Sequence, residues 1–77
     1  MEITILLFGE LAQIAGTNAL AMNAMPDTDS LKEKIHQHYP SFEKKKYVIA
    51  INKQLIKGKQ ELNENDEIAL LPPFAGG

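Results

Sequence analysis

Cysteine and tryptophan are absent from this 77-residue chain. Without thiols the protein can form no disulfide framework and no thiolate metal site, and it has no cysteine nucleophile. Small secreted domains usually depend on disulfides, so we expect a cytoplasmic protein. The sequence also has no apolar run close to the roughly 20 residues of a membrane helix. Its first residues lack the pattern of a secretory leader, and we expect neither a signal peptide nor a membrane partner.

A surplus of basic residues is missing as well. Eight basic and ten acidic residues give a net charge of −2. This balance argues against nucleic acid as a partner, because neutralising phosphates requires excess positive charge. The glycines form no phosphate-binding loop, and neither serine lies in a nucleophile motif. His36 and His38 are two positions apart on a predicted helix, so they point in different directions and cannot share a metal ion. We therefore expect no metal site, no cofactor bound by this chain and no free-standing active site.

The order of the predicted elements indicates the fold class. Residues 27–30 are a cluster of helix N-cap residues, and the apolar pattern predicts a main helix that is capped by Thr28 or Ser30 and ends before Pro40. Ser30 and Glu33 have capping-box spacing. Strands are expected at residues 2–8, 18–25, 47–52, 54–56 and 67–71, with a short helix at 10–15. One main helix covers one face of a sheet, so we predict an α+β domain with a mixed sheet of about five strands. The first and last strands are the most continuously apolar and should pair in parallel at the centre.

The connections between these elements also carry predictions. Asn52 and Lys53 form a plausible tight turn, with Asn52 at positive φ. Phe42 and Leu62 are apolar residues in otherwise polar segments, so each should pack into the core from a connector. We treat residues 1–77 as a single domain with a flexible C-terminal tail at 72–77.

The tail is the part of the sequence that is hardest to explain structurally. Two prolines restrict the backbone to extended conformations, and the apolar Phe74 follows them. The end then has almost no side chains, so it can thread a narrow channel; the tail residues are Pro72, Pro73, Phe74, Ala75, Gly76 and Gly77. Six extended residues reach at most ~20 Å. The alternative is an ordinary frayed chain end, but we predict a tail that enters another protein.

A second unexplained feature is spare hydrophobicity on the predicted sheet. Alternation places one set toward the helix: Ile3, Ile5, Leu7, Val48, Ile68 and Leu70. The other set faces away and forms a predicted partner surface: Leu6, Phe8, Ile49, Ala69 and Leu71. No second helix is available to cover all of the latter set, and exposed apolar patches mark protein–protein surfaces. The alternative is that the short helix and the loops cover part of it.

These features resemble the ubiquitin-like β-grasp sulfur carriers, and most closely the small subunits of molybdopterin synthase. The most specific match is the ending from Leu70 to Gly77, with its Pro-Pro, apolar, small, Gly-Gly pattern. The opening from Leu6 to Gly16 and the segment from Ala50 to Asn52 also match. The family usually has glycine before Asp66, where this chain has Asn65, and asparagine also tolerates positive φ.

The resemblance implies a mechanism. An E1-like activating enzyme would use ATP to adenylate the Gly77 carboxylate, and sulfur would then replace an oxygen to give a thiocarboxylate. The thiocarboxylate would donate sulfur to a pyranopterin precursor, forming the dithiolene of molybdopterin. The catalytic side chains would belong to a large subunit, in a heterotetramer of two small and two large subunits. This chain would be a non-catalytic, sulfur-donating subunit.

Three other functions fit the same sequence. The first is a sulfur carrier of the thiamine pathway, which is typically shorter and lacks both the opening helix and the Pro-Pro pair. The second is a ubiquitin-like modifier that is conjugated to lysines, because its activation begins identically. The third is an interaction module whose tail is never activated and whose binding would survive deletion of Gly76 and Gly77.

Overall fold

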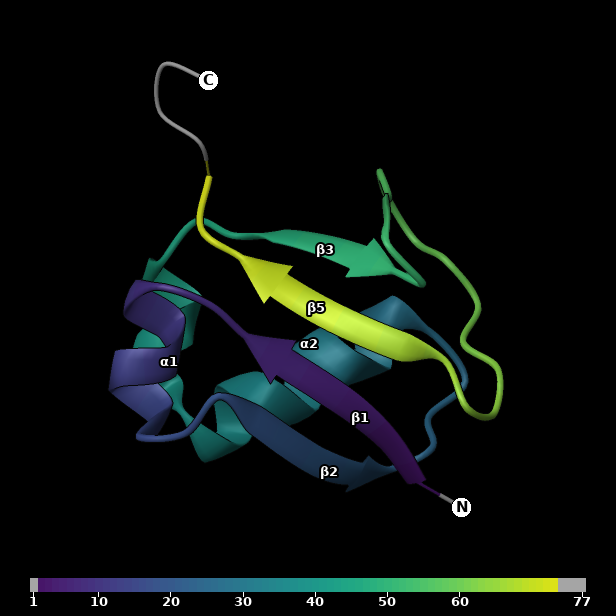
Figure 1. The fold of residues 1–77 in the computed structure, drawn as a ribbon, viewed down its shortest axis with the longest axis horizontal. Helices are drawn as coiled ribbons and strands as arrows, with labels where there is room; N and C mark the ends of the chain where they lie inside the picture. The colour runs from purple at the N-terminus through teal and green to yellow at the C-terminus, as the bar shows by residue number, and fades with distance from the viewer. Residues whose placement is uncertain (1, 74–77) are drawn as a thin grey trace.

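The computed structural model describes residues 2–73 of the chain, and it has the predicted α+β architecture. Five strands form one sheet, and helix α2 lies against one of its faces (Figure 1). A short helix, α1, follows the first strand, and a 3₁₀ helix, η1, follows α2. The elements in chain order are β1 (Glu2–Leu7), α1 (Glu10–Ala15), β2 (Ala19–Asn23), α2 (Thr28–His38), η1 (Pro40–Lys44), β3 (Val48–Ile51), β4 (Gln54–Leu55) and β5 (Glu67–Leu71).

The sheet has the strand order β2-β1-β5-β3-β4. The prediction that the first and last strands pair in parallel at the centre is confirmed, with Ile5 opposite Ile68 and Leu7 opposite Leu70. The other neighbouring strands are antiparallel. The two central strands are therefore flanked on both sides, which suits their continuous apolar sequences.

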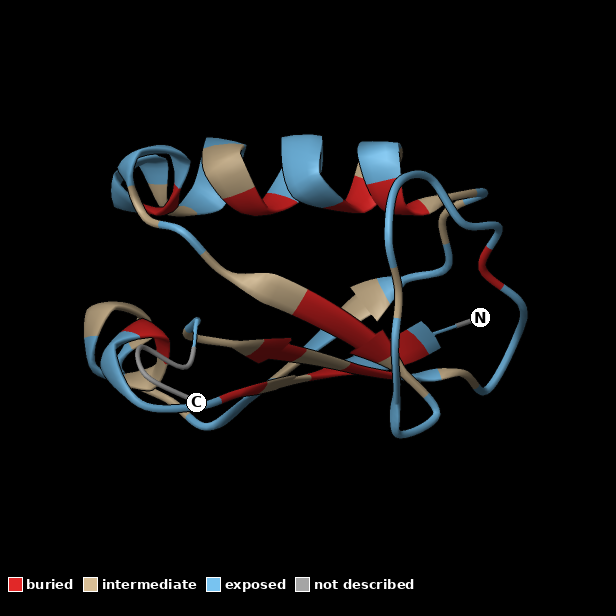
Figure 2. Cartoon of the chain, turned by 90° about the horizontal axis from the view of Figure 1, so that it is seen from above, coloured by how far each residue is buried: buried red, intermediate tan, exposed pale blue. Residues whose placement is uncertain are grey.

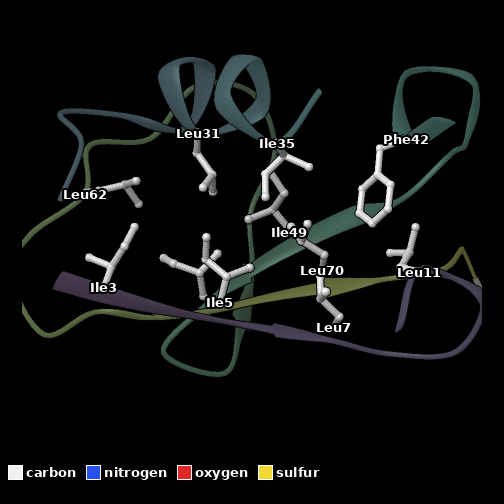
Figure 3. Close-up of a cluster of buried hydrophobic side chains, with 11 residues drawn as sticks. Ile3, Ile5, Leu7, Leu11, Leu31, Ile35, Phe42, Ile49, Leu62 and Leu70 are labelled. Carbon is white, nitrogen blue, oxygen red and sulfur yellow. The ribbon is translucent and has the colours of Figure 1, made fainter. Parts of the chain in front are cut away.

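The core lies between α2 and the sheet (Figures 2 and 3). The α2 side chains of Leu31 and Ile35 are fully buried and point toward the strands. Phe42 of η1 and Leu62 of the loop before β5 are also buried, as predicted from their apolar character in polar segments. The sheet contributes alternate residues of its central strands to this core: Ile3, Ile5, Leu7, Ile49, Ile68 and Leu70.

The predicted faces of β3 are wrong and must be exchanged. Ile49 was expected to face away from the helix, but it is only 5% exposed and belongs to the core. Its antiparallel partner is Leu70, which is also a core residue, and directly opposed residues share a face of the sheet. Val48 was expected to face the helix, but it pairs with Leu71 on the opposite face. Every residue of β3 is apolar, so alternation could not tell its two faces apart.

The predicted cap of α2 also requires correction. Neither Thr28 nor Ser30 is the N-cap; Asp27 is, and its carboxylate accepts a hydrogen bond of 2.9 Å from the Ser30 backbone N–H. This bond is the main cause that lowers the pKa of Asp27 below its ordinary value. Thr28 is fully buried, and its Oγ1 accepts a hydrogen bond from the backbone N–H of Gln60. The hydroxyl of Thr28 therefore ties the loop before β5 to the start of α2.

The segment after α2, expected to be a polar connector that Phe42 pins to the core, forms η1. Pro40 ends α2 as predicted and begins η1. Beyond η1, Lys45 forms an ion pair with Glu10, the first residue of α1. Two segments far apart in the sequence are therefore joined at the end of the sheet where α1 lies.

The turns follow the predicted backbone chemistry. Asn52 and Lys53, between β3 and β4, have φ angles of 51° and 72°, and Asn65, before β5, has φ 66°. The Asn52 side chain donates to Asp66 and accepts from the Glu67 backbone N–H, so the two turns hold each other. Within residues 2–73, no helix is long and apolar enough to cross a membrane.

Candidate functional site

The face of the sheet that points away from α2 carries an apolar surface, which we call the open face. The strand register defines it in two rows. In one row Leu6 lies beside Ala69, Ala69 beside Ala50, and Ala50 beside Leu55. In the other row Val48 lies beside Leu71. Phe8, one alternation beyond Leu6, is 45% exposed. The viewer of Figure 1 looks onto this face, with α2 behind the sheet.

Four residues of the predicted partner surface lie where the sequence placed them. Leu6, Ala69 and Leu71 are half-buried, and Phe8 is exposed. Ile49 does not belong to this surface because its side chain is in the core.

Sequence reasoning missed three residues of the open face: Val48, Ala50 and Leu55. Leu55 is 64% exposed on the short strand β4. A two-residue strand is too short to show an alternation, so its face follows only from its pairing with Ala50.

Polar residues occupy the other end of the same face. Thr4 and Glu67 pair with each other and are both exposed, two positions before Leu6 and Ala69. The open face is therefore polar near the start of β5 and apolar near its end. The apolar end is also the end from which the C-terminal segment leaves the sheet.

The root of the tail is described as far as Pro73. The two residues after the end of β5 are Pro72, which is half-buried, and Pro73, which is exposed. Pro72 lies against Gly9, the residue between β1 and α1: a Cβ placed on Gly9 would be 3.1 Å from Pro72 Cγ. Four predicted tail residues lie outside the described residues: Phe74, Ala75, Gly76 and Gly77.

No group of three or more His, Asp or Glu side chains within residues 2–73 is arranged to hold a metal ion. His36 Nε2 lies 2.9 Å from the Tyr47 hydroxyl, and burial raises the pKa of Tyr47. This contact joins α2 to the segment before β3. The arrangement as a whole places an apolar surface beside Pro72, at the root of the tail.

A mixed five-stranded sheet packed on one main helix, with the last strand parallel to the first at its centre, defines the ubiquitin-like β-grasp class. The chain belongs to the ThiS family, whose model matches residues 5–77. Similar proteins include the molybdopterin synthase sulfur carrier subunits of Dictyostelium discoideum and Caenorhabditis elegans. Each is 30% identical over 83 aligned positions; the first match covers 99% of this chain and 96% of the relative, and the second covers 100% and 99%.

Solved structures agree with this assignment. A putative molybdopterin converting factor subunit 1 from Pyrococcus furiosus has a TM-score of 0.87 at 19% identity, covering 96% of this chain and 99% of that one, which supports the fold. Small archaeal modifier protein 1 from Methanosarcina acetivorans has a TM-score of 0.81 at 25% identity, covering 99% and 96%. A chain in the complex of subunits 1 and 2 of the Helicobacter pylori molybdopterin-converting factor has a TM-score of 0.73 at 29% identity, covering all of both chains.

Proposed function

We propose that this chain is the sulfur carrier subunit of a molybdopterin synthase and acts in the cytoplasm. The observation that carries the proposal is the match to sulfur carrier subunits along essentially the whole length of both chains. The opening helix and the Pro-Pro pair, which separate this sequence from the typical thiamine-pathway carrier, support the same branch. The structure contains this opening helix as α1, at Glu10–Ala15, which agrees with a carrier of the molybdopterin branch.

The proposed chemistry takes place at the Gly77 carboxylate. One of its oxygens attacks the α-phosphate of ATP on an E1-like enzyme, pyrophosphate leaves, and an acyl-adenylate forms. Hydrosulfide supplied by the loading system then attacks the acyl carbon, the acyl C–O bond to AMP breaks, and the products are AMP and the thiocarboxylate. Adenylation is needed because a free carboxylate is a poor electrophile. Gly76 gives clearance for a partner's backbone, since it has no side chain.

The proposed partner of the loaded chain is the large subunit of the synthase. A relative of known structure is in a complex of subunits 1 and 2. The apolar end of the open face supports a comparable contact here, because Leu71 stands on that face and Pro72 is the next residue. A partner that covers Leu6, Val48 and Leu71 therefore also holds the root of the tail. We propose a heterotetramer with two copies of each subunit.

The decisive experiment is intact-mass spectrometry of the chain after incubation with the E1-like enzyme of the same organism, ATP and a sulfur donor. We expect a mass increase that corresponds to one oxygen-to-sulfur exchange, located at Gly77 by fragmentation. A chain that lacks Gly76 and Gly77 is the matched control and should show no increase. If the intact chain gains no sulfur, or only attaches to lysines, the carrier function is wrong.

A second measurement assigns the pathway. The loaded chain, mixed with the large subunit and the pyranopterin precursor, should yield molybdopterin. The same preparation should fail to support thiazole synthesis. The opposite pattern would assign the chain to the thiamine pathway instead.

Protein modification is the second candidate function, because modifier proteins of two archaea share this fold, and the one from Methanosarcina acetivorans is 25% identical. In that case a lysine amine of a target would displace AMP from the same adenylate and form an isopeptide bond. Incubation with the activating enzyme, ATP and cell extract, followed by a search for Gly77–lysine linkages, tests it. Linkages that disappear when ATP is omitted would support modification.

A further inference from the structure

Gly9 joins β1 to α1 with an unusual backbone conformation. Its φ of 57° and ψ of −132° belong to a region that residues with a Cβ rarely adopt. Gly16, at the other end of α1, also has positive φ, at 74°, but in the ordinary left-handed helical region. The surroundings differ as well: a Cβ on Gly9 would lie 3.1 Å from Pro72 Cγ and 3.7 Å from Pro72 Cδ, whereas a Cβ on Gly16 would meet nothing within 4 Å.

The strand register explains why these two residues meet. Leu7 lies opposite Leu70, and the Phe8 backbone N–H donates to the Leu70 carbonyl over 3.3 Å. Two residues beyond this pair, after the end of each strand, Gly9 lies beside Pro72. Pro72 has no N–H and cannot extend the ladder, so its contact with Gly9 is one of packing. Because Gly9 has no Cβ, the Pro72 ring can pack close to its backbone.

We propose that Gly9 is a positioning residue for the C-terminal tail. By seating the Pro72 ring, Gly9 sets the direction in which the chain leaves β5 and thereby delivers the reacting end to the active sites of its partners. This inference rests on the proposed sulfur-carrier function.

The geometry on both sides of Pro72 supports this role. The residue before it, Leu71, is held by pairing with Val48 in β3, so the ring cannot retreat along the strand without disturbing that pair. The turn that contains Gly9 is held as well, because the next residue, Glu10, forms an ion pair with Lys45. Because Leu71 and Glu10 are both held, we expect a side chain at position 9 to displace the Pro72 ring. Misplacing a reacting group by about 1 Å can cost roughly 100-fold in rate.

Four variants of the full chain separate this effect from backbone strain: Gly9→Ala, Gly16→Ala, Pro72→Ala, and Gly9→Ala combined with Pro72→Ala. Each is loaded with sulfur, and single-turnover transfer to the precursor is measured at saturating large subunit. Affinity for the large subunit and the melting temperature are recorded in parallel. Gly16→Ala introduces a positive-φ alanine without touching Pro72, and Pro72→Ala removes the Cγ and Cδ atoms that crowd position 9.

We expect Gly9→Ala to lower the transfer rate by roughly 10- to 100-fold, while Gly16→Ala stays within about twofold of the unmodified chain. In the Pro72→Ala background the effect of Gly9→Ala should shrink to about threefold or less, because the crowding atoms are gone. A Gly9→Ala effect of equal size in both backgrounds would show that strain alone is responsible and would overturn the proposal. So would an unchanged transfer rate in folded Gly9→Ala.

A measurement on the unsubstituted chain covers the case in which Gly9→Ala does not fold. Nuclear Overhauser effects between the Gly9 α-protons and the Pro72 ring protons are expected, and their absence would contradict the seating of the ring. Failure of the proposed function is distinguishable, because an unsubstituted chain that takes up no sulfur refutes sulfur carriage whatever the Gly9 variants do.

Discussion

The two faces of the sheet are built from the same strands but differ in how deeply their side chains are buried. On the helix-covered face, Ile5, Ile68 and Leu70 are at most 1% exposed. On the open face, their neighbours Leu6, Ala69 and Leu71 are only half-buried. Because neighbouring residues of a strand point to opposite faces, one residue can be essential to the fold while the next is available to a partner. We therefore expect substitutions on the two faces to separate stability from partner binding, residue by residue.

The largest expected effect comes from truncating neighbouring residues on opposite faces. Ile5→Ala should lower the free energy of unfolding by about 2–5 kcal/mol, because it leaves a cavity where a fully buried side chain was removed. Leu6→Ala should cost only roughly 1 kcal/mol, since its side chain is already partly solvated. Chemical denaturation of both variants measures this directly. Equal losses would show that the open face is as structural as the core.

Binding should respond in the opposite sense. Phe8→Ala should weaken the complex with the large subunit by roughly tenfold, or about 1.4 kcal/mol, because an exposed aromatic side chain is a typical interface anchor. Its melting temperature should barely change. Lys32→Ala, exposed on α2, is the control and should leave the affinity unchanged. Calorimetric titration tests both, and a Phe8→Ala complex of full affinity would remove Phe8 from the proposed interface.

A smaller effect is expected at high pH, at the border of the helix-covered face. Burial raises the pKa of Tyr47 in the folded protein above its unfolded value, so the stability gained from the neutral phenol is complete below about pH 10. That stability is lost as the pH rises through the folded pKa. Unfolding experiments across this range should show a decline that Tyr47→Phe largely removes. A decline of the same size in Tyr47→Phe would assign it to other groups.

The smallest effect tests how far the open face extends. Leu55→Ala should change the free energy of unfolding by no more than about 0.5 kcal/mol, because the side chain is mostly exposed. It should nevertheless weaken binding to the large subunit by a few-fold if the partner reaches strand β4. An unchanged affinity would limit the interface to β1, β5 and β3. The control is again Lys32→Ala.

The local features of the chain were predictable where one residue type had a clear physical preference. Asn52 and Asn65 adopt the positive φ angles that asparagine tolerates. The Leu6 and Leu71 positions followed from an alternation in strands whose ends were well marked. Gly16 ends α1 with a left-handed conformation, as a C-terminal glycine commonly does.

Errors arose where several residues could play the same local role. Four possible caps stand in succession at residues 27–30, where α2 begins. Asp27 is the cap, while Thr28 is buried and bonded to Gln60, 32 residues away in sequence. Sequence reasoning interpreted Gly9 only as the end of a strand. Its contact with Pro72 depends on two segments that the parallel pairing brings together.

Composition and periodicity were thus sufficient for the α+β class and for the strands at the centre of the sheet. Those properties depend on side-chain size, polarity and backbone preference, which each residue carries with it. The face of β3, the inclusion of Val48 and Leu55 in the open face and the seat of Pro72 required the folded chain. Each depends on the register between strands, because a shift of one residue moves a side chain to the other face of the sheet.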